Sequence, residues 1–132
     1  MQLDLANKTA LVTGASRGIG LAIVRVLASA GAQVWIVDRN EPADETVAAR
    51  FVRADVSERA SLADAFAQCG PLDIAVANAG IARHAEFTAT DDATWRETLA
   101  VNLTGAFLTV QLAAQEMKRI SARRKFDTDY AS

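Results

Sequence analysis

The segment at residues 13–20, Thr-Gly-Ala-Ser-Arg-Gly-Ile-Gly, constrains the fold more than any other part of the chain. It follows an apolar, strand-like run at residues 9–12 and precedes an apolar-periodic helix. Gly14 permits a sharp turn off the strand, Gly18 permits close approach of a phosphate, and Gly20 lets the helix pack tightly. Because the first N–H groups of a helix and its dipole attract anions, the segment predicts a phosphate-binding turn.

A carboxylate after the second apolar run supports a nucleotide ligand. Asp38 ends the run 34–37, at about the twenty-residue spacing at which an acid accepts hydrogen bonds from ribose hydroxyls. Each signal has a structural alternative, because any tight strand-to-helix turn can use glycine and a strand can end in an ordinary Asp. Together they favour a dinucleotide site.

Strand-like and helix-like patterns alternate along the chain with short connections, which is typical of a parallel sheet covered by helices. The expected fold is a Rossmann-type, doubly wound α/β domain over residues 1–120, incomplete after its long last helix and followed by a tail at residues 121–132. The sheet order is predicted as 3-2-1-4, with the fourth strand buried on both faces. We expect strands at 8–13, 33–38, 50–54 and 72–77, and helices at 18–30, 57–69 and about 92–120.

Turn and cap residues mark the predicted helix ends. Gly31 is expected to end the first helix, Ser57 to cap the second, and Thr90 or Asp91 to cap the third. The polar loop through Pro42 is a candidate for one further helical turn.

Composition narrows the class of protein. A length of 132 residues with 51% hydrophobic content fits one globular domain. A net charge of −2 gives no footprint for nucleic acid, and the basic cluster at 118–125 is interpreted as a solvated helix end. The single Cys69, with no signal peptide, membrane span or metal-ligand cluster in the pattern, predicts a cytoplasmic protein without a metal site.

Four motifs resemble one family. They are the glycine turn, Asp55-Val56 after the third strand, Asn78-Ala79-Gly80 after the fourth, and Asn102 in the long helix. Their order and spacing resemble the short-chain dehydrogenase/reductase family over roughly residues 5–118. The resemblance implies oxidation of an alcohol or reduction of a carbonyl compound with a nicotinamide dinucleotide.

The resemblance also assigns roles to strand-end residues. Asp55 and the backbone of Val56 would face adenine, although Asp55 could instead simply cap the following helix. Asn78 would hold neighbouring backbone through its amide, while Ala79 and Gly80 leave room for a ribose; a purely structural turn is the alternative. The full set assigned to the cofactor is Gly14, Ser16, Arg17, Gly18, Ile19, Gly20, Asp38, Arg39, Asp55, Val56, Asn78, Ala79 and Gly80.

Asn102 corresponds to the Asn of the family's Asn-Ser-Tyr-Lys catalytic set. An Asn in an apolar helix is locally unfavourable, because its amide competes with the backbone ladder. By resemblance it marks a local irregularity whose freed carbonyl holds a water in a proton relay; a helix-bending residue without catalytic duty is the alternative. His84, in the loop after Gly80, is interpreted as a surface histidine.

Cofactor choice favours NAD over NADP. Asp38 would repel a 2′-phosphate and accept ribose hydroxyls. Arg17 and Arg39 are the residue types with which NADP-preferring relatives hold that phosphate. Because placing a phosphate beside a desolvated Asp costs more than a flexible Arg recovers, NAD is the predicted cofactor.

After Met117 the sequence departs from the family pattern. Residues 121–132 show no apolar strand, and Ser121 lies too early to be the family serine. Tyr130 has no lysine four residues on to lower the pKa of its phenol from about 10. The expectation is a cofactor-binding half that is inactive alone; the alternatives are a non-catalytic dinucleotide-binding module and a truncated or frame-shifted product.

The long helix is apolar on nearly every side, which is typical of a helix buried by several neighbours. With few elements expected to cover it, we predict self-association through residues 92–120, giving a homo-oligomer, or poor solubility. A methyltransferase-type Rossmann domain also places an acid after its second strand, but residues 78–80 and the eight-residue glycine turn argue against it.

Overall fold

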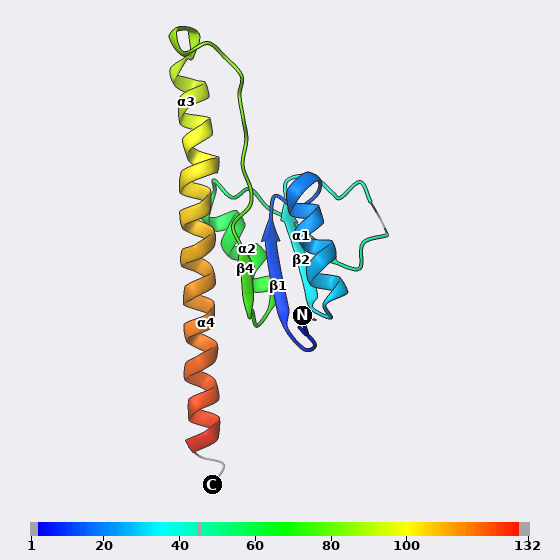
Figure 1. Cartoon of the computed structure of the whole chain (residues 1–132). Coiled ribbons are helices and arrows are strands. Elements are labelled where there is room, and N and C mark those ends of the chain that lie inside the picture. The colour runs from blue at the N-terminus through cyan, green and yellow to red at the C-terminus, as the bar shows by residue number, and fades with distance from the viewer. Residues whose placement is uncertain (1–2, 45, 130–132) are drawn as a thin grey trace.

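Four parallel strands form a single sheet in the order β3-β2-β1-β4, as the computed structural model in Figure 1 shows. The structure describes residues 3–44 and 46–129, with side chains as far as Phe126, so the predicted tyrosine segment 130–132 lies outside the described residues. The expected Rossmann-type α/β fold and its strand order are confirmed. The strands are β1 (Thr9–Thr13), β2 (Gln33–Asp38), β3 (Arg50–Arg53) and β4 (Ile74–Val76).

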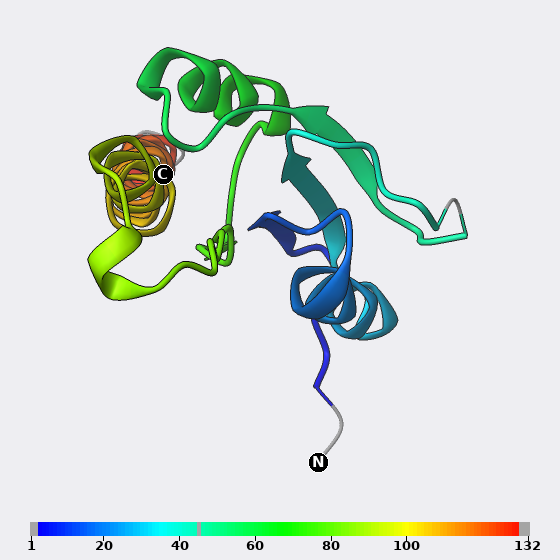
Figure 2. The same ribbon diagram turned by 90° about the horizontal axis from the view of Figure 1, so that it is seen from above.

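Helices cover both faces of the sheet, which Figure 2 shows from above. α1 (Gly18–Ser29) lies on one face, while α2 (Arg59–Cys69) and α4 (Ala106–Asp129) lie on the other. α4 is preceded without a break by α3 (Asp92–Leu99) and by the π-helical segment η2 (Ala100–Gly105). A short 3₁₀ turn, η1 (Phe87–Ala89), precedes α3.

Alternation along β1 builds the two halves of the core. Val12 packs on the face of α1 with Val24, whereas Leu11 packs on the opposite face with Leu62 and Phe66 of α2. Successive strand residues point to opposite faces, so a run of apolar residues fills both layers. Residues 10–13 of this central strand are buried, so its carboxyl end, from which the glycine turn leaves, lies in the core.

The prediction that the fourth strand is buried on both faces is wrong. β4 is half-buried along its whole length. It stands at the end of the strand order and pairs only with β1, with Val12 opposite Val76. An edge strand lacks a neighbour on one side, so its side chains are covered less than those of β1.

Helix ends follow the predictions in part. Gly31, at φ +97°, follows the end of α1, and Asp91 caps α3 by accepting a hydrogen bond from the backbone amide three residues on. Ser57 does not cap α2: its hydroxyl and amide both donate to Asp55, and the helix begins at residue 59. The loop through Pro42 contains no helix among its described residues.

The last helix is longer than predicted. It does not end at residue 120 but continues to Asp129, and Figure 1 shows this helical column extending past both ends of the sheet. The residues after 120 include good helix formers such as Ala, Arg and Lys, and they contain no proline or glycine. Among the described residues, no helix is both long and apolar enough to cross a bilayer.

Candidate dinucleotide site

An open cavity of about 550 Å³ lies where the strands end at their carboxyl sides. All predicted cofactor residues except Asp55 line it, and Asn102 does not. Ligands bind at this edge in open α/β sheets, because loops from neighbouring strands meet there. The lining residues that sequence reasoning did not assign are Val37, Asn40, Ala54, Ile81, Arg83 and Val101.

The three glycines of the turn meet different physical requirements. Gly14 has φ +64°, and a Cβ there would lie 2.5 Å from the Cα of Ala79. A Cβ on Gly20 would lie 2.5 Å from Nδ2 of Asn78. Gly18 also has a positive φ, +60°, but a Cβ there would have no heavy atom within 4 Å. The turn therefore packs against the loop after β4 at Gly14 and Gly20, and leaves open space at Gly18.

The loop after β4 is attached to β1 by hydrogen bonds from the Asn-Ala-Gly motif. The buried hydroxyl of Thr13 accepts from the backbone amides of Asn78 and Ala79, each at 3.1 Å. The side-chain amide of Asn78 donates to the carbonyls of Thr13 at 3.1 Å and Gly14 at 3.0 Å. The Asn78 amide thus holds the neighbouring backbone, and these contacts fix one wall of the cavity. Thr13 opens the turn predicted from the sequence, but no role was predicted for its hydroxyl.

Asp38 lies at the end of β2 with both carboxylate oxygens hydrogen-bonded to backbone. Oδ2 accepts from the amide of Ser16 and Oδ1 from the amide of Asn40, each at 3.0 Å. The carboxylate is half-buried and lines the cavity next to the glycine turn. An acid at this place is positioned to accept ribose hydroxyls, since each oxygen carries two lone pairs.

Asp55 and Arg39 form a pair near the cavity. Nε of Arg39 lies 3.9 Å from Oδ2 of Asp55, and Oδ1 accepts from the hydroxyl and amide of Ser57. Burial opposes the charge of this carboxylate, but the Ser57 hydrogen bonds and the Arg39 charge outweigh it and lower the pKa of Asp55. Oδ2, which accepts none of the Ser57 hydrogen bonds, is the oxygen that faces Arg39.

Asn102 lies inside η2, so the predicted local irregularity in the long helix is present. Its side-chain Oδ1 accepts from the amide of Ile81 at 2.8 Å, and its Nδ2 donates to the carbonyl of the same residue at 2.9 Å. This paired contact attaches the helix to the loop after β4. Gly105 ends η2, where a Cβ would lie only 2.7 Å from Cγ2 of Val56.

These residues fit a dinucleotide. The first turn of α1 contains no acidic residue, so its N–H groups are available to an anion. Gly18 leaves the open space that a phosphate needs, and Ile19 presents an exposed apolar side chain to the same cavity. The cavity thus combines an anion-binding end, a carboxylate and an apolar surface.

Comparison with known proteins agrees with this geometry. The model of the family described as short chain dehydrogenase matches residues 8–125, which include the glycine turn, Asp38 and both strand-end motifs. The chain belongs to the short-chain dehydrogenase family. The match reaches 125, beyond the predicted domain boundary at 120, which stays a prediction.

Two curated family members illustrate the similarity. Galactitol 2-dehydrogenase (L-tagatose-forming) of Cereibacter sphaeroides is 43% identical over 78% of this chain and 44% of its own length. The NADP-dependent (R)-specific alcohol dehydrogenase of Lentilactobacillus kefiri is 38% identical over 86% of this chain and 50% of its own length. The chain therefore spans about half the length of the curated relatives it matches.

A solved structure supports the fold. A short-chain type dehydrogenase/reductase from Mycobacterium marinum matches with a TM-score of 0.82 at 35% identity, over 88% of this chain and 52% of that one. The parallel sheet with its covering helices thus has the architecture of a short-chain dehydrogenase.

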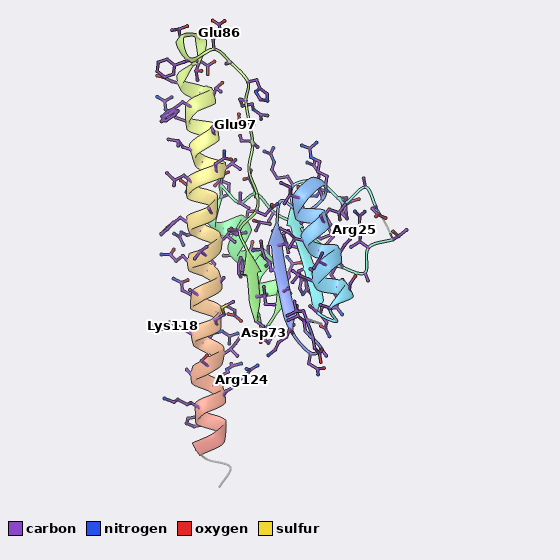
Figure 3. All side chains as sticks on the ribbon, viewed as in Figure 1. Arg25, Asp73, Glu86, Glu97, Lys118 and Arg124 are labelled. Carbon is purple, nitrogen blue, oxygen red and sulfur yellow. The ribbon has the colours of Figure 1, made fainter. Side chains whose placement is uncertain are left out.

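The side chains of Arg83 and His84 lie in the loop after β4. Arg83 lines the cavity and forms an ion pair with Glu97 of α3, whose place on the helix Figure 3 labels, with Nη2 and Oε1 2.9 Å apart. His84 is exposed and is not among the lining residues. No group of three or more metal-binding side chains occurs within the described residues.

Proposed function

We propose that this chain is the dinucleotide-binding half of an NAD-dependent oxidoreductase that interconverts an alcohol and a carbonyl compound. The supporting observation is that the glycine turn and the carboxylate of Asp38 line one cavity at the carboxyl edge of the sheet. When bound, NAD supplies the hydride acceptor for such a reaction. The dehydrogenase names of the curated relatives agree with the reaction class.

The proposed roles follow the positions of the residues around the cavity. The turn and the first N–H groups of α1 hold the pyrophosphate, and Asp38 accepts the adenosine ribose hydroxyls. Asp55 and Val56 face adenine from the end of β3. The Asn78–Gly80 loop borders the second ribose, which its small residues allow to approach closely.

The preference for NAD rests on charge. A 2′-phosphate would lie beside Asp38, whose carboxylate is already half-buried. Arg17 and Arg39 are exposed and could reach such a phosphate, but Arg39 is also drawn to Asp55 at 3.9 Å. Desolvating a phosphate next to a carboxylate costs more than these mobile side chains return, so NAD is the proposed cofactor.

Proton transfer is assigned to the part of the relatives' length that this chain does not span. Asn102 is the proposed contribution of this chain, because its π-helical segment breaks the regular backbone ladder and can leave a carbonyl available to water. The contact of Asn102 with Ile81 would hold that segment in place.

Calorimetric titration of the chain with NADH and with NADPH tests the proposal. We expect saturable heat with both, and at least about tenfold tighter binding of NADH. Arg39→Ala should weaken NADPH more than NADH, because only NADPH carries the 2′-phosphate. Failure to bind either cofactor would contradict the dinucleotide site, and a preference for NADPH would contradict the choice of NAD. Binding without turnover of any alcohol would favour a non-catalytic module.

A homo-oligomer in the cytoplasm is the proposed setting. Trp95, Leu103, Phe107 and Val110, here called the apolar stripe, are each more than half exposed on α3, η2 and α4. Exposed apolar stripes of this kind mark contact surfaces.

Burial raises the pKa of the Cys69 thiol to about 12, so this cysteine is unreactive and gives no reason to assign an oxidising compartment.

A further inference from the structure

The carboxylate of Asp38 lies between two parts of the cavity: the part proposed to bind the ribose and the glycine turn proposed to bind the phosphates. It would face the ribose, yet its Oδ2 already accepts the backbone amide of Ser16, 3.0 Å away in the glycine turn. Ser16 is buried, and a buried N–H without a partner is costly. Because an ionised acceptor makes a stronger hydrogen bond than a neutral one, this contact anchors the turn.

The end of β2 holds the turn at two successive points. The amide of Gly14 donates to the carbonyl of Val37 at 2.8 Å, and the amide of Ser16 donates to Asp38. Ala15, between the two donors, is fully buried. The end of β2 thus holds the chain at Gly14 and Ser16, between β1 and the start of α1.

The helix that follows, α1, has no capping side chain at its first turn. It begins after Arg17, and its first turn carries no acidic residue. Helices usually fix their first turn with a capping side chain. Asp38 instead holds the backbone amide of Ser16, which is one residue before the cap position Arg17.

We propose that Asp38 is a positioning residue for the phosphate-binding turn, in addition to its contact with the ribose. The inference rests on the proposed dinucleotide function. Removing the carboxylate then weakens the binding of a diphosphate even when no ribose hydroxyl is present. If Asp38 acted through the ribose alone, its removal would not change the affinity for a ligand without ribose hydroxyls.

The test compares ADP with 2′,3′-dideoxy-ADP on the wild type, Asp38→Ala and Asp38→Asn. The asparagine removes the charge and keeps one oxygen, which can accept from the Ser16 amide only if its NH2 group replaces the oxygen that accepts from Asn40. We expect Asp38→Ala to weaken dideoxy-ADP at least about tenfold, because a hydrogen bond to a charged group is lost. Asp38→Asn keeps a neutral acceptor, so it should weaken dideoxy-ADP less than Asp38→Ala does. Asp64→Ala, which removes an exposed carboxylate on α2, is the control and should change neither ligand.

Amide hydrogen exchange at Ser16 in the free protein gives a second readout that needs no ligand. Exchange should be at least about tenfold faster in Asp38→Ala, with a smaller increase in Asp38→Asn. Equal affinity of Asp38→Ala and wild type for dideoxy-ADP, or unchanged exchange at Ser16, would overturn the positioning role. Failure of the wild type to bind ADP would overturn the proposed function, while the exchange experiment would still decide the role of Asp38.

Discussion

At the residue scale, the glycine turn shows that a positive φ and a close contact are separable requirements. Gly14 and Gly18 have φ values of +64° and +60°, but only Gly14 has a neighbour in the way. We expect Gly18→Ala to lower the free energy of unfolding by about 1 kcal/mol, the cost of the left-handed conformation. Gly14→Ala should cost at least about 2 kcal/mol more, because its Cβ would lie 2.5 Å from backbone of Ala79. Denaturant unfolding measures both; equal losses would contradict the packing argument.

A single carboxylate also predicts part of the pH dependence of stability. Despite burial, the Ser57 hydrogen bonds and the Arg39 charge lower the pKa of Asp55 in the folded state. The stabilisation is therefore complete above the unfolded pKa of about 4 and is lost as pH falls through the folded pKa. Asp55→Asn should lower the unfolding midpoint at neutral pH, and the difference from wild type should shrink in acid. A constant difference across this range would contradict it, with Asp64→Asn as the surface control.

What the sequence reveals about single residues depends on how far away their partners are. The spacing of Asp38 from the glycine turn was sufficient to predict that both would line one cavity. The role of the Thr13 hydroxyl was not predicted, because it accepts from Asn78 and Ala79, which are 65 and 66 residues away along the chain. The partner of Asn102 was likewise unpredictable, since no local pattern points to the backbone of Ile81.

At the element scale, the sequence predicted existence and order better than ends. β2 was placed at its observed bounds, because an apolar run is bordered by polar residues on both sides. The start of α2 was misplaced, since Asp55 captures the hydroxyl and amide of Ser57 and leaves it unavailable as a cap. A serine before a helix can cap the helix or bind a nearby carboxylate, and only the three-dimensional contact decides which it does.

The close contact between Gly105 of η2 and Val56 in the turn after β3 gives a prediction about the packing of these two segments. Gly105→Ala would place its Cβ 2.7 Å from Cγ2 of Val56, so we expect a loss of about 1–3 kcal/mol in stability. Val56→Ala removes that methyl. In this background, Gly105→Ala should lower the free energy of unfolding by at least about 1 kcal/mol less than it does in the wild type. Unfolding curves of the wild type, both single variants and the double variant measure this coupling. Strict additivity would show that the two elements do not constrain each other.

At the scale of the whole molecule, the layers leave one helical surface without a partner among the described elements. α1 covers one face of the sheet, and α2 and α4 cover the other, while the apolar stripe lies on the exposed side of α3, η2 and α4. Leu103, Phe107 and Val110 follow one another at spacings of four and three, which places them on one side of the helix. A continuous apolar strip of this kind is more stable when it is shared with another surface than when it faces water.

Self-association through the stripe is therefore expected to depend on protein concentration. Phe107 is the largest side chain in the centre of the stripe, so Phe107→Glu should place a charge in the contact and shift the protein toward monomer by at least about tenfold in dissociation constant. Gln115→Glu adds the same charge at an exposed polar position of α4 and should leave association unchanged. Sedimentation velocity over a range of concentrations measures all three proteins. A wild type that sediments as a monomer throughout would contradict the contact, and equal effects of the two substitutions would show that charge, not the apolar stripe, governs assembly.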